Sequence, residues 1–265
     1  MLDHYKRDIN YLRISVTDKC NLRCTYCMPE EGVKLLPHPE ILSFEEIVAF
    51  AKIAVQNGIT KIRLTGGEPL VRNGIVELVK MLSKINGIKD LSMTTNGTLL
   101  EKYAENLADA GLKRVNISLD TTNAEQYCSI TRNGNIEDVF KGIKAAIIAN
   151  LTPIKINCVL LGQPDEETIK LQEFCDENQL SLRFIHQMNL QTGEFSLIQG
   201  GDGGNCSKCN RIRLLANGDV KPCLFSDLAY NTRELGIEQA INLAIGNKPK
   251  TGTYSKSLSF SQIGG

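Results

Sequence analysis

The chain has 265 residues, with 30 Lys and Arg against 30 Asp and Glu, so its formal net charge is zero. A neutral chain argues against a broad electrostatic surface for nucleic acid or membrane, although it leaves a local basic pocket open. Hydrophobic residues make up 42% and charged residues 23%, as in soluble globular proteins. There is no apolar leader after Met1 and no apolar run of about 18 residues, so the sequence predicts a cytoplasmic protein.

Strands and helices are predicted to alternate from residue 11 to about residue 185. The predicted strands, which show alternating or short apolar runs, cover residues 12–16, 62–64, 91–94, 115–119, 154–161 and 182–185. Between them lie predicted amphipathic helices over residues 43–57, 75–85, up to 110, 136–149 and from 165 onward. Six such βα units imply a parallel sheet with helical crossovers. Because eight units close a barrel, we predict an α/β fold of the open, partial (βα)6 TIM type.

The composition and the strand–helix pattern of the chain change after residue 188. A glycine-rich stretch covers residues 193–204, a cysteine group follows, and the remaining tail is weakly patterned up to Gly264 and Gly265. This predicts a barrel over residues 1–188 and a C-terminal region with its tail over residues 189–265.

Nine cysteines are many for a cytosolic protein, and their odd number and uneven spacing fit a disulfide framework poorly. Three of them, Cys128, Cys158 and Cys175, stand alone and need no function. The other six form two tight groups: Cys20, Cys24 and Cys27, and Cys206, Cys209 and Cys223. Grouped thiols in a reducing compartment suggest a metal or a cluster.

The first cysteine group directly follows the first predicted strand, at the sheet end where barrels of this type carry their chemistry. Three thiolates can hold three irons of a four-iron cubane and leave the fourth iron open to a ligand. The alternative is a structural zinc knuckle, which needs a fourth ligand, and His38 is the only close histidine. The spacing favours the cluster.

The run from Cys20 to Cys27, C-N-L-R-C-T-Y-C, resembles the signature of the radical S-adenosylmethionine (SAM) enzymes. Gly66-Gly67-Glu68-Pro69 resembles the methionine-binding motif of that superfamily; its glycines let the backbone approach a ligand, and its carboxylate can pair with an ammonium. Alone, the second motif could equally be a turn that ends a strand. Together the two motifs predict radical chemistry over residues 11–188.

The second cysteine group again supplies three thiols, and Arg211 and Arg213 lie immediately beside it. Structural zinc would need a distant fourth ligand. A second three-thiolate cluster with an open iron explains the arrangement more simply.

Further motifs surround the two cysteine groups: L-R-I-S-V-T-D before the first group, K-I-R before Gly66, C-N-R-I-R-L and K-P-C-L around the second group, and the terminal double glycine. Taken together, they resemble the GTP 3',8-cyclase family of molybdenum cofactor biosynthesis. The resemblance implies a radical SAM lyase that converts GTP to (8S)-3',8-cyclo-7,8-dihydroguanosine 5'-triphosphate. It implies two [4Fe-4S] clusters and SAM as cofactors, with one cluster cleaving SAM and the other presenting an open iron to guanine.

The resemblance also assigns roles to single residues. The cluster ligands are Cys20, Cys24, Cys27, Cys206, Cys209 and Cys223. The residues that bind SAM are Tyr26, Gly66, Gly67, Glu68, Ser118, Arg183 and Met188. The residues that bind GTP are Arg13, Arg63, Thr94, Lys155, Arg211 and Arg213. The residues with catalytic roles are Arg211, Arg213, Gly264 and Gly265.

Several convergent cations are what a triphosphate requires, because guanidinium groups bind phosphate oxygens bidentately. Other interpretations of single residues stay open: Arg63 and Lys155 could be solvated strand ends, and Met188 could be core packing. The implied partners are GTP, a reductant protein, the next enzyme of the molybdopterin pathway and a second copy of the chain in a homodimer.

One feature departs from the family pattern. Only the 17 residues 189–205 separate Met188 from Cys206, considerably fewer than the family normally has there. Two other interpretations therefore stay open. One is a two-cluster radical maturase acting on a peptide or protein, because a shorter wall would suit a bulkier substrate. The other is a non-catalytic iron–sulfur electron carrier, in which Gly66–Pro69 would serve no purpose.

Overall fold

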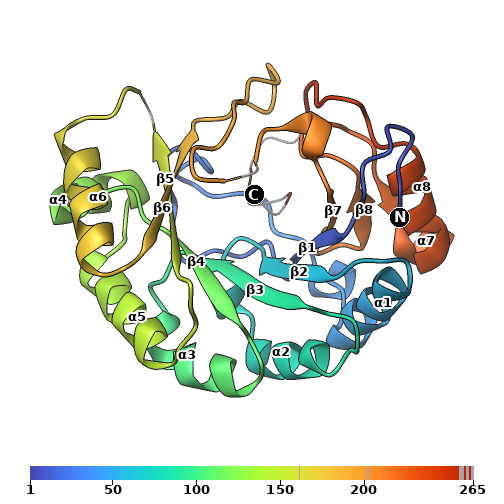
Figure 1. Cartoon of the computed structure of the whole chain (residues 1–265), viewed down its shortest axis with the longest axis horizontal. Coiled ribbons are helices and arrows are strands. Elements are labelled where there is room, and N and C mark those ends of the chain that lie inside the picture. The colour runs from blue at the N-terminus through green and yellow to red at the C-terminus, as the bar shows by residue number, and fades with distance from the viewer. Residues whose placement is uncertain (161, 202, 257–259, 261–262, 264–265) are drawn as a thin grey trace.

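The computed structural model describes residues 1–160, 162–201, 203–256, 260 and 263 of the chain. Within them, one curved sheet of nine strands surrounds an open interior, and helices cover its outer face (Figure 1). The strand order is β6-β5-β4-β3-β2-β1-β7-β8-β9. Neighbours from β6 to β7 are parallel, whereas β8 and β9 are added antiparallel.

The strands are short and their bounds follow the apolar runs closely. They are β1 (Tyr11–Ser15), β2 (Lys61–Thr65), β3 (Asp90–Thr95), β4 (Arg114–Ser118), β5 (Lys155–Leu160), β6 (Ser181–His186), β7 (Arg211–Leu214), β8 (Asp219–Lys221) and β9 (Tyr230–Asn231).

The helices lie between these strands and after them. They are α1 (Phe44–Gln56), α2 (Ile75–Ser83), α3 (Leu100–Asp109), α4 (Ala124–Thr131), α5 (Ile136–Ile148), α6 (Glu166–Glu177), α7 (Thr232–Leu235) and α8 (Ile237–Gly246). Three 3-10 turns join them: η1 (His38–Glu40), η2 (Pro69–Val71) and η3 (Cys206–Lys208).

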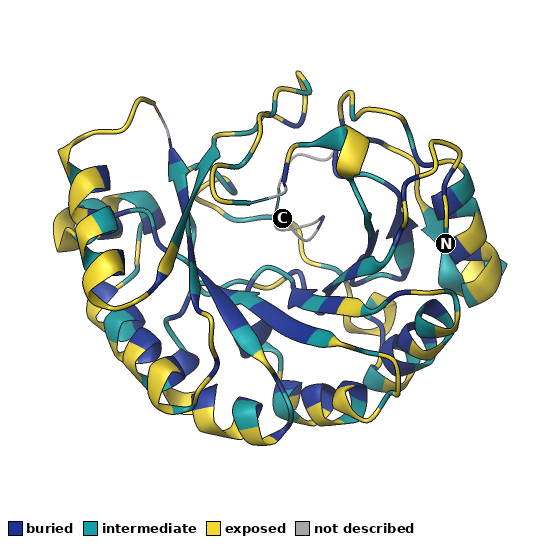
Figure 2. Cartoon of the chain, viewed as in Figure 1, coloured by how far each residue is buried: buried dark blue, intermediate teal, exposed yellow. Residues whose placement is uncertain are grey.

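The two faces of the sheet differ in chemistry because side chains alternate along each strand. In β1, Leu12 and Ile14 are fully buried against the helices, whereas Tyr11 and Arg13 line the interior. The same alternation recurs in β2, β4 and β7. The helices accordingly show buried faces toward the sheet and exposed faces outward (Figure 2). The apolar core therefore lies between sheet and helices, and the concave side is left for polar groups.

The predicted open barrel of six βα units is confirmed, and the sequence prediction was incomplete in the C-terminal region. β7 pairs in parallel with β1, with Tyr11 opposite Arg211 and Arg13 opposite Arg213. The sheet thus continues across the predicted boundary at residue 188, and the tail expected to be weakly patterned contains helix α8. None of the helices in the described part of the chain is long and apolar enough to cross a bilayer.

Candidate active site

A cavity of about 550 Å³ occupies the concave side of the sheet, a size typical of ligand sites. Both cysteine groups line it, and so do most of the residues predicted to bind SAM or GTP: Arg13, Tyr26, Arg63, Gly66, Gly67, Thr94, Ser118, Lys155, Arg183, Met188, Arg211 and Arg213. Residues from strands far apart in the sequence therefore meet in one cavity. Gly264 and Gly265 lie outside the described residues.

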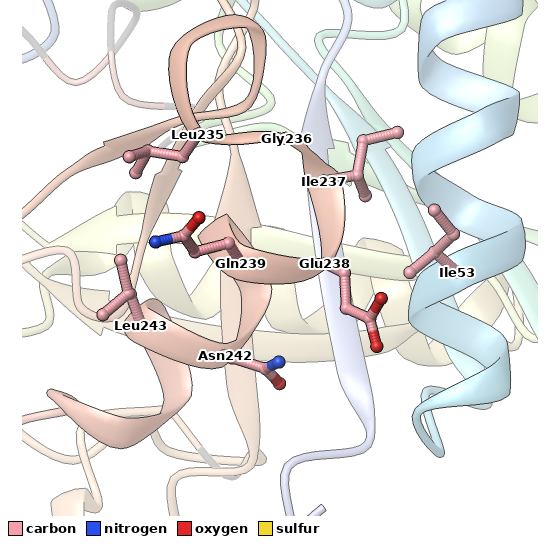
Figure 3. Close-up of a pocket in the computed structure, with 8 residues that line it drawn as sticks. All are labelled: Ile53, Leu235, Gly236, Ile237, Glu238, Gln239, Asn242 and Leu243. Carbon is pink, nitrogen blue, oxygen red and sulfur yellow. The ribbon is translucent and has the colours of Figure 1, made fainter.

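A second hollow, of about 720 Å³, lies on the outer surface between α1 and α8 (Figure 3). Its lining includes Ile53, Ile237 and Leu243, and Glu238 is the only ionisable side chain among the eight described residues that form it. None of the six grouped cysteines lines it, whereas all six line the concave cavity, which is therefore the candidate site.

The first cysteine group sits in a loop fixed by several hydrogen bonds. The backbone N–H of Cys27 donates to the Cys24 carbonyl at 2.9 Å, and the Arg23 guanidinium donates to the Cys20 carbonyl at 2.8 Å. Arg132, which follows α4, donates to the carbonyl of Arg23 at 2.7 Å and to that of Met28 at 3.0 Å. The loop is therefore shaped by contacts with its own backbone and with α4.

The electrostatics of this loop favour a positively charged ligand at the thiols. Burial, together with the neighbouring Cys27, Asp120 and Cys20, raises the pKa of Cys24 to about 12. Burial also raises the pKa of Cys20. Thiolates crowded together in a buried site need the compensating charge that iron provides.

Zinc is the alternative for both cysteine groups, and the described residues bear on it. Among them, no three His, Cys, Asp or Glu side chains converge closely enough to hold a single metal ion. A four-iron cluster does not require such convergence, because each of its protein thiolates binds a different iron.

The Gly66–Pro69 turn packs tightly against the strand end that leads into the first cysteine group. Gly67 donates its N–H to the Thr17 carbonyl at 2.8 Å, and Glu68 donates its N–H to the Lys19 carbonyl at 2.8 Å. A Cβ atom would lie 2.6 Å from the Thr17 oxygen at Gly66, and 2.3 Å from the Lys19 oxygen at Gly67. Only glycine fits at either position, and both glycines also line the cavity.

Glu68 is placed differently from its two neighbours. Its carboxylate is buried below the turn, where it accepts hydrogen bonds from Leu70 N–H at 2.9 Å, the Thr95 hydroxyl at 2.8 Å and Asn96 N–H at 2.7 Å. Burial raises its pKa to about 7, and these hydrogen bonds partly oppose the rise. The side chain braces β2 against the end of β3, and a direct contact with SAM stays a prediction.

Asp120 is a functional candidate that the sequence did not single out, because its position is typical of a turn or cap. The Tyr26 hydroxyl donates to its carboxylate at 2.7 Å, and the Val159 N–H donates to the other carboxylate oxygen at 2.7 Å. Burial raises the pKa of Asp120 to about 6. This residue therefore ties the cysteine loop to β5.

The second cysteine group is held by two buried cations from the chain's ends. Arg7 donates to the carbonyl of Cys206 at 2.8 Å, and Lys248 donates to the carbonyls of Arg211, at 2.8 Å, and Pro222. Burial raises the pKa of Cys209, but Lys248 and Arg211 more than offset this and leave it below its ordinary value. No sequence motif indicated that Arg7 and Lys248 would meet here.

Arginines form a row across three neighbouring strands. Arg13 of β1 lies opposite Arg63 of β2 on one side and opposite Arg213 of β7 on the other. Burial lowers the pKa of Arg13, and the nearby Arg213, Arg63 and Arg211 lower it further. Burial likewise lowers the pKa of Arg213, to about 10. Guanidinium groups crowded in this way form a strong anion site.

Some buried polar atoms of the cavity have no hydrogen-bond partner among the described residues. They are the hydroxyls of Tyr11 and Thr94 and the amide nitrogen of Asn116. All three residues line the cavity. Because buried polar groups are nearly always satisfied in native proteins, these atoms indicate a polar ligand.

Comparisons with known proteins identify the family of the chain. Residues 14–175 match the radical SAM superfamily. The GTP 3',8-cyclase of Alkaliphilus oremlandii (strain OhILAs) is 40% identical over 321 aligned positions that cover 100% of both chains. The GTP 3',8-cyclase of Thermodesulfovibrio yellowstonii is 42% identical, covering 89% of this chain and 88% of that one. The chain belongs to the GTP 3',8-cyclase family of the radical SAM superfamily.

Solved structures of other radical SAM proteins share the fold. Streptococcus suis SuiB bound to S-adenosylmethionine superposes with a TM-score of 0.66 at 19% identity, covering 91% of this chain and 66% of SuiB. Native anSMEcpe with bound AdoMet gives a TM-score of 0.66 at 17% identity, covering 97% of this chain and 88% of anSMEcpe. Membership of the superfamily makes the chain an enzyme and implies a [4Fe-4S] cluster and SAM.

Within the GTP 3',8-cyclase family, this chain is short. The alignment with the Alkaliphilus relative spans 321 positions, 56 more than the 265 residues of this chain. The 17-residue segment 189–205 nevertheless forms part of the cavity wall through Phe195, Ile198 and Asn205. It is anchored by a bridge between Gln199 and Phe184 of β6.

The last described residues of the tail also return to the cavity. Phe260 lines it, and Ile263 is 2% exposed in a small apolar cluster with Leu190, Leu215 and Phe225. Phe260 and Ile263 are therefore packed beside Cys223 of the second cysteine group.

Proposed function

We propose that this chain is a GTP 3',8-cyclase that converts GTP to (8S)-3',8-cyclo-7,8-dihydroguanosine 5'-triphosphate in molybdenum cofactor biosynthesis. The observation that carries the proposal is one cavity lined by both three-cysteine groups and by a row of arginines from β1, β2 and β7. Identity of about 40% to cyclases over the full chain supports the same assignment.

The first cysteine group suits a [4Fe-4S] cluster with SAM. Cys20, Cys24 and Cys27 would bind the cluster, and the close approach that Gly66 and Gly67 permit would bring backbone groups against SAM. When bound, these cofactors supply the one-electron chemistry that removes a hydrogen atom from the substrate. The protein fixes the substrate relative to them and excludes water from the cavity.

The second cysteine group suits a second [4Fe-4S] cluster. Its thiols flank the start of β7, directly beside Arg211 and Arg213. A nucleotide whose base lies at this group would place its phosphates among the arginines of β1, β2 and β7. Thr94 and Asn116, with their unpartnered buried atoms, would then contribute neutral hydrogen bonds.

We also propose three partners for the chain. A reductant protein would supply electrons, the next enzyme of the molybdopterin pathway would take the product, and two copies of the chain would form a homodimer.

The short segment 189–205 lines the cavity through Phe195, so we assign this segment to the wall of the nucleotide site.

Anaerobic turnover tests the proposal. The protein is reconstituted with iron and sulfide, supplied with reductant and SAM, and its products are followed by mass spectrometry with and without GTP. We expect deoxyadenosine that depends on GTP, together with a cyclised guanine nucleotide. Deoxyadenosine with GTP left unchanged would instead indicate a maturase that acts on a peptide or protein. Absence of SAM binding would indicate an electron carrier.

A further inference from the structure

We propose that Tyr11 is a substrate-contacting and positioning residue of the nucleotide site. Its ring holds two arginine side chains in place, and its hydroxyl donates a hydrogen bond to the triphosphate. This inference rests on the proposed function and adds a neutral aromatic residue to a site otherwise described by its cations.

Tyr11 lies where the arginine row is densest. It is the first residue of β1, and its neighbour Leu12 is fully buried toward the helices, so Tyr11 faces the cavity. On β7 it lies directly opposite Arg211, and on β2 it lies opposite Lys61. The ring is therefore flanked by cationic residues from both neighbouring strands.

Two guanidinium groups contact the ring itself. The guanidinium carbon of Arg63 is 5.5 Å from the ring centroid, and that of Arg211 is 5.8 Å from it. Both distances fall within the range of cation–π attraction. Since β2 and β7 lie on opposite sides of β1, a single ring steadies arginines from two different strands.

An aromatic partner suits this site better than a carboxylate. Burial lowers the pKa of Arg13, and repulsion from the guanidinium groups of Arg213, Arg63 and Arg211 lowers it further. A carboxylate would relieve the repulsion but would also compete with an anionic ligand for the same groups. A ring attracts cations through its quadrupole and carries no negative charge that would compete with phosphate for them.

The hydroxyl of Tyr11 is the second feature that indicates a contact with the ligand. The atom is fully buried and has no hydrogen-bond partner among the residues that the structure describes. A buried hydroxyl without a partner is costly, so its presence in a ligand cavity indicates a partner on the ligand. Because the surrounding groups are guanidiniums, the acceptor of matching chemistry is a phosphate oxygen.

Two substitutions separate the hydroxyl from the ring. Tyr11→Phe removes only the hydroxyl, and Tyr11→Leu removes the ring as well. Tyr5 provides a matched control, because Arg7 lies 5.1 Å from its ring centroid but Tyr5 is 48% exposed and outside the cavity. Tyr5→Phe should therefore leave nucleotide binding unchanged.

Binding is measured anaerobically on the cluster-loaded protein with GTP, inorganic triphosphate and guanosine as separate probes. Tyr11→Phe should weaken GTP and inorganic triphosphate about tenfold, the usual loss for a hydrogen bond to a charged group. Tyr11→Leu should weaken both by about thirtyfold or more, because the arginines also lose their support. Guanosine affinity should stay within about twofold for both variants, a selectivity that a merely structural role would not produce.

Each outcome decides the question. Unchanged triphosphate binding by Tyr11→Phe would refute the phosphate contact, and an equal loss for guanosine would move the contact to the nucleoside. If Tyr11→Leu does not fold, the Phe variant, which keeps the ring, still decides the contact. If the unaltered protein binds no GTP, the proposed function itself fails; normal GTP binding with an unaffected Tyr11→Phe overturns only this inference.

Discussion

Replacing Arg7 by Met should destabilise the protein strongly, because Arg7 forms a buried ion pair. Its side chain is 6% exposed and that of its partner Asp3 is 0% exposed, with 2.5 Å between Nε and Oδ2. Arg7 also donates to the Cys206 carbonyl at 2.8 Å and to the Pro249 carbonyl at 2.7 Å. The substitution would leave the buried Asp3 carboxylate without its charge partner and with only the backbone N–H donors of residues 5 and 7. It would also remove the side-chain donor to the carbonyls of Cys206, Pro249 and Lys250.

Breaking a buried pair by removing one partner costs roughly 3–5 kcal/mol. For a chain of this size, each kcal/mol lowers Tm by about 2–4 °C, so a fall of about 6–20 °C is expected. Arg233 is the control, because it pairs with Glu46 at 2.8 Å and both side chains are 39% exposed. Arg233→Met should cost at most about 1 kcal/mol.

The assay is urea unfolding of the cluster-free, reduced protein, supplemented by the iron content after reconstitution. Burial raises the pKa of Asp3, and hydrogen bonds from Arg7 and Tyr5 more than offset this and leave it lowered. The stabilisation is therefore complete above the ordinary pKa and is lost as the pH falls through the lowered one. At pH 7, equal costs for Arg7→Met and Arg233→Met would refute the reasoning, and so would an unaltered stability of Arg7→Met.

Three further substitutions test other parts of the site. Cys24→Ala should abolish deoxyadenosine formation and lower the bound iron by about half. The control is Cys128→Ala, at an exposed lone thiol, which should do neither. If Cys24→Ala still formed deoxyadenosine, the assignment of the cluster ligands would be wrong. Arg213→Ala should weaken GTP turnover at least about tenfold with the iron content unchanged, and a variant with normal GTP kinetics would exclude Arg213 from the site. Because burial raises the pKa of Glu68 to about 7, the cluster-free protein should lose stability, by about 3 kcal/mol at most, as the pH rises from about 4.5 to 7. In urea unfolding, Glu68→Gln should make the free energy of unfolding less dependent on pH over this range. An unchanged pH dependence would contradict the raised pKa of Glu68.

The barrel part of the fold could be predicted from the sequence because the signals for its strands and helices are local. The alternation of Leu12 and Ile14 with Arg13 and Ser15 specifies a strand with one apolar and one polar face, and the structure shows that strand. Cysteine spacing is equally local, so both groups could be recognised without knowing the fold. The same rule would have found β7, since Arg211-Ile212-Arg213-Leu214 alternates in the same way.

The remaining features of the site depend on contacts between distant segments. Arg7 and Lys248 are separated by almost the whole chain, and they meet only because β7 pairs with β1 and α8 follows it. Asp120 resembles an ordinary turn residue until the fold places Tyr26 2.7 Å from it. Glu68 could be assigned to a motif, but burial against Thr95 could not be predicted from that motif.

The central strand β1 explains how one cavity serves two cysteine groups. At the start of β1, the Asn210 carbonyl, next to Cys209, accepts hydrogen bonds from Asn10 and Tyr11, both at 3.1 Å. At its other end, the chain turns through Thr17 into Cys20. Five residues of strand span about 17 Å, so the two groups face each other along the length of β1 with Arg13 between them. A substrate held between them needs a base that reaches the second group, a reactive carbon within reach of the first group and negative charge where the arginines lie. A nucleoside triphosphate carries all three. The pairing of β7 with β1 is thus the structural step that turns two separate thiol groups into one site.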